Sequence, residues 1–235
     1  MKENFLGVDV SSYSYDELVR NLSNDIKTNQ QSFIVAINPE KILKAQEDPN
    51  LMNLLNEATY QIPDGVGAVL ASRLKGGKIK ERVTGIDMFL ALCEQAEIEG
   101  NSIFLYGAKP GVADMASENL VKRFPSLKIS GVLDGYEKDQ DRIVRTINEA
   151  KPDILFVALG SPAQEYWIVE NMKNLDVNVF QGVGGSFDVI SGRVKRAPKL
   201  FRKLGLEWFY RLIREPWRIK RQMKLPLFLL KVLRK

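Results

Sequence analysis

The sequence predicts an α/β fold in which a largely parallel sheet carries helices on both faces. Short apolar runs alternate with longer segments of helical period along the first 192 residues. Strands separated by helices of about 10 to 15 residues form parallel βαβ units, as in Rossmann-like sheets. The expected strands are residues 33–37, 102–106, 127–133, 154–159 and 177–181, and a further short apolar segment lies at 60–62. The expected helices are residues 39–47, 50–58, 65–74, 85–99, 110–124, 138–150 and 161–174.

The composition narrows the chemistry that the protein can perform. The 235 residues include no histidine, which excludes histidine as a general base, as part of a Ser-His triad and as a metal ligand. Proton transfer near neutral pH must then rest on a carboxylate, a tyrosine, a lysine or the substrate. The single cysteine, Cys93, excludes an internal disulfide and fits a reducing compartment. Cys93 falls in an apolar helical pattern, so we expect it to be buried.

Charge is distributed unevenly along the chain. Residues 193–235 contain 15 lysines and arginines and two acidic residues, a net charge of +13. Residues 1–192 contain the other 19 basic residues and 27 acidic residues, a net charge of −8. We therefore expect an α/β core over residues 1–192 and a basic appendage over residues 193–235. Such an appendage binds an anionic surface, either phospholipid or nucleic acid.

Apolar side chains recur in the appendage at helical spacing. Phe201, Leu204, Trp208 and Leu212 define a helix face that packs on the core or on a partner such as a second subunit. The stretch 223–231 mixes lysines with leucines and an aromatic residue, which is typical of an interfacial membrane segment. Its apolar run, 227–230, is far shorter than the roughly 20 residues of a spanning helix. The sequence thus predicts a helical, membrane-binding appendage, with no spanning segment and no signal peptide.

Glycine-rich loops follow two of the expected strands. In parallel sheets, ligands bind at the carboxyl ends of the strands, where these loops lie. Glycines between a strand and a helix let backbone N–H groups approach a phosphate closely. A tight turn is the alternative for each glycine taken singly, and neither loop contains a dinucleotide fingerprint. The candidate residues are Gly107 and Ala108 in one loop, and Gly182, Gly184, Gly185 and Ser186 in the other.

Asp64 is the acid most suggestive of catalysis. It follows a short apolar segment and stands between Pro63 and Gly65, where a substrate would enter. A partly shielded carboxylate there could have its pKa raised towards the range useful to a general base. The pattern also fits a helix N-cap, since aspartate is a good start signal for the helix expected from residue 65. The residues by themselves leave both interpretations open.

A D-x-D motif occurs at Asp139 and Asp141. Many metal-dependent sugar transferases use this motif to bind a metal ion. Here it lies in a hydrophilic segment between Lys138 and Arg142, not at the end of an apolar strand. Carboxylates in the first turn of a helix interact favourably with the helix dipole. We therefore interpret the two aspartates as the start of a helix, and we expect no metal site.

An ordered series of motifs runs through the chain. They are residues 38–40 (NPE), 62–67 (IPDGVG), 81–85 (ERVTG), 156–165 (FVALGSPAQE), 182–188 (GVGGSFD), 196–198 (RAP), 205–208 (GLEW) and 214–218 (REPWR). The series resembles the WecG/TagA/CpsF family of bacterial glycosyltransferases, glycosyltransferase family 26, over about residues 5–221. Among its members, the chain is most similar to the TagA/TarA branch, which makes the linkage unit of wall teichoic acid.

The resemblance implies a reaction that the residues alone do not name. Members of the family transfer a sugar from a UDP-sugar to an undecaprenyl-diphosphate-linked sugar, with inversion and without a metal or other cofactor. For the TagA branch the donor is UDP-N-acetylmannosamine, and the acceptor is N-acetylglucosaminyl-diphospho-undecaprenol. The implied partners are these two substrates and the anionic lipids of the inner face of the plasma membrane. The protein would be cytoplasmic and peripheral, and would bind no nucleic acid.

The resemblance also implies roles for particular residues. The aspartate of the Pro-Asp-Gly motif, Asp64 here, would act as the base. The leaving diphosphate would be stabilised by backbone donors of Gly184, Gly185 and Ser186, and by cations. These cations are Arg82 and, from an appendage that closes over the site, Arg211, Arg218 and Arg221. The remaining substrate-binding candidates are Asn38 and Gln164 for the sugar or diphosphate, Asp188 and Tyr136 for the uridine, and Gly107, Ala108 and Gly182.

Other functions remain compatible with parts of the sequence. A non-catalytic nucleotide-binding module that is recruited to membranes or RNA would explain the glycine loops and the basic appendage. A member of the same family with another donor, such as a uronic acid or a hexose, would carry the same motifs. A Rossmann dehydrogenase is disfavoured because no G-x-G-x-x-G motif with a downstream acidic residue is present. A homo-oligomer is also compatible with the sequence, because the apolar helix face that contains Trp208 could pack against a second subunit.

Overall fold

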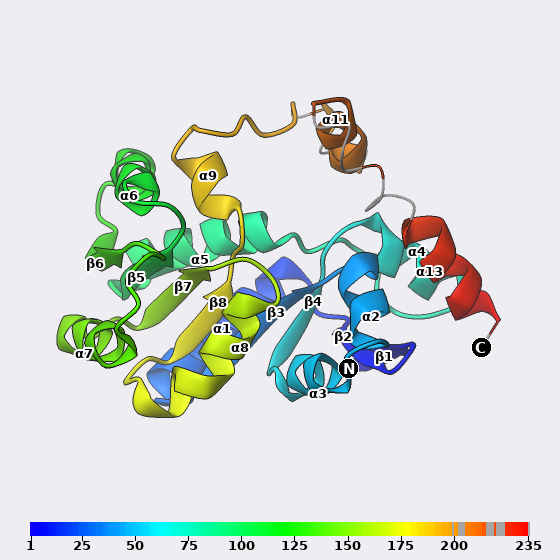
Figure 1. The fold of residues 1–235 in the computed structure, drawn as a ribbon, viewed down its shortest axis with the longest axis horizontal. Coiled ribbons are helices and arrows are strands. Elements are labelled where there is room, and N and C mark those ends of the chain that lie inside the picture. The colour runs from blue at the N-terminus through cyan, green and yellow to red at the C-terminus, as the bar shows by residue number, and fades with distance from the viewer. Residues whose placement is uncertain (199, 202–204, 215–218, 220–223, 235) are drawn as a thin grey trace.

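A parallel six-stranded sheet forms the centre of the protein. The computed structural model describes residues 1–198, 200–201, 205–214, 219 and 224–234 (Figure 1). The strand order is β4-β3-β8-β7-β5-β6, and each neighbouring pair is parallel. The strands are β3 (Ser32–Ile37), β4 (Tyr60–Pro63), β5 (Ser102–Gly107), β6 (Lys128–Leu133), β7 (Ile154–Ala158) and β8 (Val179–Gly182). The predicted α/β fold with a parallel sheet is confirmed.

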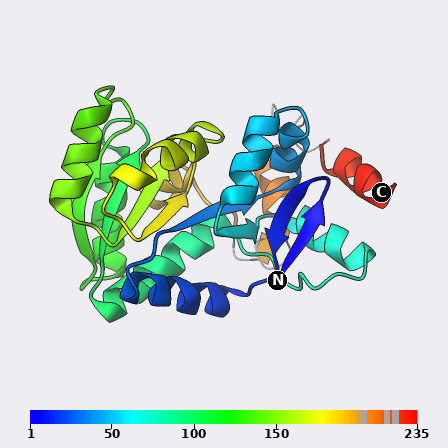
Figure 2. The ribbon, with the colours of Figure 1, turned by 90° about the horizontal axis from the view of Figure 1, so that it is seen from below.

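Helices cover both faces of the sheet because its strands are apolar on both sides. In β7, Leu155 and Val157 belong to one apolar cluster, and Ile154 and Phe156 belong to the other. The first cluster includes residues of α2 (Pro39–Ala45), α3 (Pro49–Glu57), α4 (Val66–Leu74), α7 (Gln140–Ala150) and α8 (Ala163–Asn171). The second includes residues of α1 (Tyr15–Lys27), α5 (Gly85–Glu99), α6 (Val112–Arg123) and α9 (Ser186–Ile190). Figures 1 and 2 show the resulting layers.

The structure adds elements that the sequence pattern did not predict. An antiparallel hairpin joins β1 (Lys2–Phe5) to β2 (Val8–Ser11), and each strand has only four residues, too few for a clear period. Helix α1 also went unpredicted, although Ser14 and Glu17 form a capping box at its start. Cys93 lies fully buried in α5, as expected. A single 3-10 turn, η1 (Met172–Asn174), continues α8.

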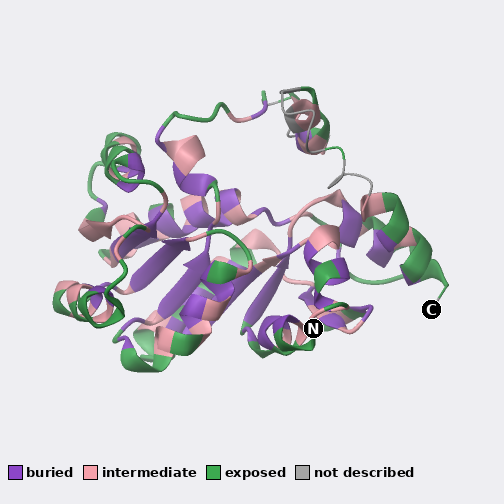
Figure 3. Cartoon of the chain, viewed as in Figure 1, coloured by how far each residue is buried: buried purple, intermediate pink, exposed green. Residues whose placement is uncertain are grey.

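Two helices are described in the appendage, α11 (Glu207–Arg214) and α13 (Lys224–Leu233). Helix α13 packs against α2 and α4. Phe228 is fully buried there, with its ring centroid 6.3 Å from that of Phe5. This burial corrects part of the interfacial interpretation of residues 223–231, because Phe228 belongs to the protein core. Leu227 and Leu230 remain 47% and 56% exposed on the other side of the helix. Figure 3 shows buried and exposed segments together along α13.

The described helices do not include a membrane span. Among the residues whose structure is described, none of the helices combines the length and apolar character needed to cross a bilayer. The apolar exposure of α13 is instead restricted to one face of a helix that is docked on the core.

We predict that Phe228→Ala lowers the free energy of unfolding by about 3 kcal/mol, because it removes a fully buried ring and leaves a cavity. Urea denaturation followed by circular dichroism measures the change. Leu230→Ala, on the exposed face of the same helix, is the matched control and is expected to change stability by less than about 0.5 kcal/mol. Equal stability of the two variants would show that α13 does not dock on the core.

Candidate active site

A cavity of about 790 Å³ opens at the carboxyl ends of β3, β4, β7 and β8. Its wall contains residues from the loops that follow these strands and from the appendage. Trp208, Tyr210 and Leu225 contribute the appendage side of this wall. Nine of the residues predicted from the sequence line the cavity: Asn38, Asp64, Arg82, Gln164, Gly182, Gly184, Gly185, Ser186 and Asp188. The fold therefore brings most of the predicted site together.

Asp64 lines the cavity and is not the cap of the following helix. Strand β4 ends at Pro63, and the backbone N–H of Asp64 donates to the carbonyl of Ile37 at 2.8 Å. The N-cap position of α4 is Gly65, whose φ of +90° is strained for residues with a side chain. No side chain among the described residues caps α4. The cap interpretation of Asp64 is therefore wrong, and the residue belongs to the cavity wall; its role as a base stays a prediction.

Asn38 has a structural role as well as a place in the cavity wall. It is the N-cap of α2, and its side-chain oxygen accepts from the backbone N–H of Lys41 at 2.9 Å. Pro39 occupies the first helical position, where the missing N–H costs nothing. The cap holds the Asn38 side chain at the carboxyl end of β3. Its amide nitrogen is the group that could donate to a ligand.

The glycine loop after β8 is packed tightly around Gln164. A side chain on Gly182 would lie 2.5 Å from Nε2 of Gln164, so only glycine fits there. The backbone N–H of Gly184 donates to Oε1 of Gln164 at 2.9 Å. The backbone N–H and the hydroxyl of Ser186 both donate to the carbonyl of Val183. Two of the three backbone donors expected to bind a diphosphate are thus already used within the protein.

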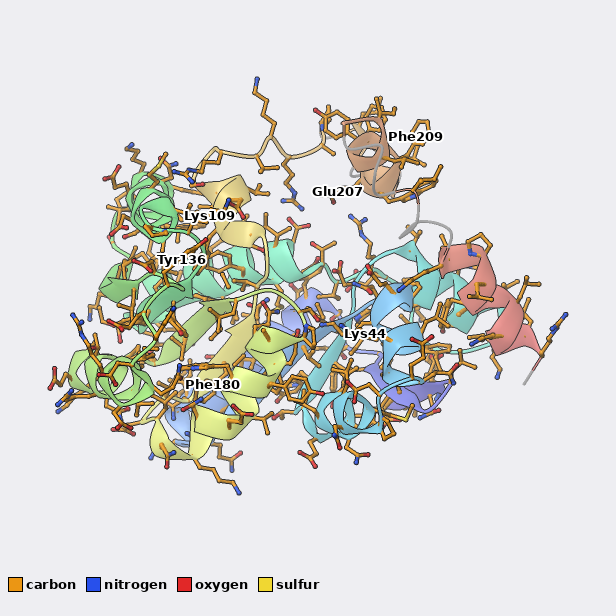
Figure 4. All side chains as sticks on the ribbon, in the orientation of Figure 1. Lys44, Lys109, Tyr136, Phe180, Glu207 and Phe209 are labelled. Carbon is orange, nitrogen blue, oxygen red and sulfur yellow. The ribbon has the colours of Figure 1, made fainter. Side chains whose placement is uncertain are left out.

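A chain of charges joins the appendage to the core at the mouth of the cavity. Glu207, which is buried at the start of α11, lies 3.7 Å from Nη2 of Arg82 and 3.7 Å from Nε of Arg196. Nη2 of Arg196 donates to Asp87 at 2.7 Å, and Thr84 caps α5 beside it. Figure 4 shows Glu207 on the side of α11 that faces the core, with Phe209 turned away. Arg82, Arg196 and Glu207 all line the cavity.

The environment keeps Arg196 charged. Burial by itself lowers the pKa of this guanidinium, but the hydrogen bond to Asp87 and the charges of Asp87 and Glu207 outweigh burial and raise the pKa above its ordinary value. The Arg196 side chain is 13% exposed, so its positive charge stands in a partly desolvated place where it acts strongly on a bound anion. Arg196 therefore adds a second cation to Arg82 at the same wall.

Three predicted residues lie apart from this cavity. Gly107 ends β5, and a side chain there would meet the backbone of Ala158 at 2.6 Å, which explains the glycine structurally. Ala108 donates its N–H to the carbonyl of Ala158 at 2.8 Å. Tyr136 follows β6 and is exposed; Figure 4 shows it with Lys109 at the β5–β6 end of the sheet. Their part in substrate binding stays a prediction.

The three arginines predicted to contribute from the appendage lie wholly or partly outside the described part of the structure. Arg211 lies within α11, and nothing is described of its side chain. Arg218 and Arg221 lie outside the described residues. Helix α11 ends at Arg214. Leu204, of the expected apolar face, is also outside the described residues, whereas Trp208 of that face lines the cavity.

The D-x-D motif starts a helix, as interpreted from the sequence. Asp139 is the N-cap of α7 and accepts from the backbone N–H of Arg142 at 3.0 Å. Gln140 between the aspartates accepts from the indole N–H of Trp167 at 2.8 Å. Within the part of the chain that the structure describes, no three carboxylate or thiol side chains come together as ligands of a metal ion.

Comparison with known proteins identifies the family of this chain. The family model described as "Glycosyl transferase WecG/TagA/CpsF family" matches residues 3–235. The chain belongs to the WecG/TagA/CpsF family of glycosyltransferases. Family membership accounts for the order of the motifs that follow the strands, from residue 38 to residue 188.

Several curated relatives of this chain are named N-acetylglucosaminyldiphosphoundecaprenol N-acetyl-beta-D-mannosaminyltransferase. That of Bacillus subtilis strain 168 is 41% identical over 201 residues, which cover 86% of this chain and 78% of the relative. That of Bacillus spizizenii is 39% identical over 206 residues, 88% of this chain and 80% of the relative. That of Staphylococcus aureus strain MW2 is 33% identical over 233 residues, 98% of this chain and 92% of the relative.

The structure also places residues in or beside the cavity that the sequence did not assign. Arg196 and Glu207 lie in motifs to which the sequence analysis assigned no function. Their ion pairs, Arg196 with Asp87 and Glu207 with Arg82, show that they join the appendage to the cavity wall. Lys41 lies one helical turn after Asn38, in a segment read only as a helix. One signal in the sequence was available for Lys41. A lysine at a position that the apolar pattern predicts to be buried, in the first turn of a helix that follows a strand, indicates a buried charge near a site.

We predict that Glu207→Gln loosens α11, because it leaves Arg82 and Arg196 without the carboxylate between them. Hydrogen exchange of the amides of residues 207–214 is expected to become about tenfold faster, which corresponds to about 1.4 kcal/mol of local stability. Mass spectrometry of the labelled protein measures the rates. Glu118→Gln, an exposed acid on α6, is the control; an unchanged rate in Glu207→Gln would show that the ion pairs do not hold α11.

Proposed function

We propose that this protein transfers N-acetylmannosamine from UDP-N-acetylmannosamine to N-acetylglucosaminyl-diphospho-undecaprenol. The product is the β-1,4-linked disaccharide lipid of teichoic acid synthesis, with UDP as the second product. The observation that carries the proposal is the convergence of Asp64, Arg82 and the family motifs on one cavity. Relatives named for this activity are 33–41% identical to the chain over most of its length, which supports the same donor and acceptor.

Asp64 is the proposed general base. In a single inverting displacement, the C4 hydroxyl of the acceptor attacks the anomeric carbon while the bond from that carbon to the UDP oxygen breaks. The hydroxyl proton passes to the Asp64 carboxylate, and the bonding electrons leave with the diphosphate. The chain has no histidine to take this proton, and Asp64 is a carboxylate of the cavity wall that does not cap its helix.

The leaving diphosphate is proposed to bind at the cationic wall. Arg82 and Arg196 stand together there, and charges fixed in a partly desolvated cavity stabilise a developing anion without reorganising in the reaction. Because Gly184 and Ser186 already use their backbone N–H groups, cations carry more of this task than the sequence suggested. Arg211, Arg218 and Arg221 remain proposed contributors from the appendage.

We further propose that the protein works as a peripheral protein on the inner face of the plasma membrane. The appendage has a net charge of +13, which attracts anionic lipids. Leu70 and Leu74 of α4 and Leu227 and Leu230 of α13 are exposed on two helices that pack together. Val66 and Leu225, at the starts of the same helices, line the cavity. A lipid-linked acceptor on this surface would thus present its sugar to Asp64.

We predict that the wild-type protein releases UDP from UDP-N-acetylmannosamine only when the lipid-linked acceptor is present, and that Asp64→Asn lowers kcat by about 10²- to 10⁴-fold, the usual contribution of a general base. A coupled assay of UDP release, with nuclear magnetic resonance of the disaccharide linkage, measures both. UDP-N-acetylglucosamine and the uronic acid donor, offered in parallel, test the choice of donor. Asp141→Asn, at the surface of α7, is the control; a folded Asp64→Asn protein with a near-normal rate contradicts the assignment.

We predict that Leu227→Glu/Leu230→Glu weakens binding to vesicles of phosphatidylglycerol at least tenfold, because two apolar contacts are replaced by charges that repel the lipid. Vesicle co-sedimentation measures the binding. Turnover with a water-soluble, short-chain acceptor should stay within about twofold of the wild type. Ile98→Glu, an exposed apolar position at the end of α5, is the matched control, and equal vesicle binding by both variants would refute the assignment of this surface.

A further inference from the structure

A network of buried polar side chains crosses the end of β8 at the wall of the cavity. Nζ of Lys41 lies 2.8 Å from Oε1 of Glu165, and the same oxygen accepts from Nε2 of Gln164 at 3.0 Å. Oε1 of Gln164 accepts from the backbone N–H of Gly184 at 2.9 Å. Lys41 is on α2, after β3, whereas Glu165 and Gln164 are on α8, after β7. Strand β8 lies between β3 and β7. The polar network therefore links the helices that follow β3 and β7 to the glycine loop that follows β8.

Burying the ion pair of this network costs free energy, and the stability of the protein alone does not account for its presence. The Lys41 side chain is 8% exposed and the Glu165 side chain is 0% exposed. Removing two charges from water costs free energy that their attraction recovers only with good geometry and further hydrogen bonds, and apolar replacements of such pairs are often as stable. Oε2 of Glu165 is buried and accepts no hydrogen bond within the described residues. A buried ion pair whose lysine lines a binding cavity requires a reason other than packing.

The polar network determines the orientation of the Gln164 side-chain amide. With its oxygen toward Gly184 and its nitrogen toward Glu165, both contacts pair a donor with an acceptor. Rotating the amide by 180° would set its NH₂ group against the N–H of Gly184 and its oxygen against the Glu165 carboxylate. Both contacts would then be repulsive in a buried place. Glu165 and Gly184 therefore select one orientation, and the ion pair with Lys41 holds the Glu165 side chain in place.

We propose that Glu165 is a positioning residue for donor binding, acting through Gln164, and that Lys41 is its buried ion-pair partner. One N–H of Gln164 donates to Glu165, which leaves the second to donate to an oxygen of the ligand, from the side chain that lines the cavity. The same contacts hold Gly184 at the end of β8 and so set the shape of the glycine loop. The inference rests on the proposed function for the identity of the ligand, a UDP-sugar, but the contacts themselves exist without it.

Two double variants separate positioning from simple packing. Lys41→Met/Glu165→Gln and Lys41→Met/Glu165→Met both remove the two buried charges and keep unbranched side chains of similar size. Only the first keeps an oxygen at position 165 that can accept from Gln164. We expect the first to bind UDP and UDP-N-acetylmannosamine within about threefold of the wild type. We expect the second to bind at least tenfold more weakly, with thermal midpoints of the two within about 3 °C. Calorimetry and thermal unfolding measure these quantities.

A spectroscopic readout tests the same contacts without turnover. In ¹H–¹⁵N spectra of the ligand-free protein, the amide of Gly184 and the side-chain NH₂ of Gln164 should keep their wild-type shifts in the glutamine double variant and lose them in the methionine one. Equal affinities and equal spectra of the two variants would overturn the proposal. Should the methionine variant unfold, Gln164→Met supplies the test: adding Lys41→Met/Glu165→Gln to it must then cause no further loss of affinity, and an additional loss overturns the proposal.

Failure of the inference is distinguishable from failure of the proposed function. A wild-type protein that binds UDP but transfers no N-acetylmannosamine would contradict the reaction and leave the comparison of the two variants intact. A wild-type protein that transfers the sugar while both variants bind alike would contradict only the role of Lys41 and Glu165.

Discussion

The common direction of the six strands is the constraint from which the site follows. Because all neighbouring strands are parallel, every loop that leaves a strand opens at the same edge of the sheet. Asn38, Asp64, Gln164 and Gly184 follow four different strands, yet they meet around one cavity. The apolar character of both sheet faces, which helices must cover, keeps these four strand ends in fixed positions. The proposed base, the amide proposed to bind the sugar and the glycine loop thereby lie around one cavity.

Close contact at this edge has a chemical consequence. The loop after β8 approaches α8 so tightly that Gly182 leaves room only for Gln164, and polar groups there satisfy one another. A glycine loop that looks like an open cradle for phosphate in the sequence is partly filled by a glutamine in the fold. The proposed anion binding then rests more on Arg82 and Arg196, which line the same cavity.

The appendage is attached to the core by two physically different contacts. Phe228 of α13 is buried beside Phe5, while Glu207 of α11 lies between two arginines. Apolar burial involves no charge, whereas ion pairs are weakened by the screening of dissolved salt. The same segment supplies Trp208 and Leu225 to the cavity wall. The proposed membrane contact and the shape of the site thus both depend on the appendage.

The sequence by itself determined the α/β class, the parallel strands, the basic appendage and the glycosyltransferase family, because apolar period, charge and motif order are local features. It could not determine whether Asp64 caps a helix, since that depends on the backbone of Gly65 and the position of Ile37. Nor could it reveal that Lys41 pairs with Glu165, 124 residues away, or that Arg196 pairs with Asp87, 109 residues away. Such pairs exist only once the strand order brings distant helix starts together, and tertiary structure alone decides that order.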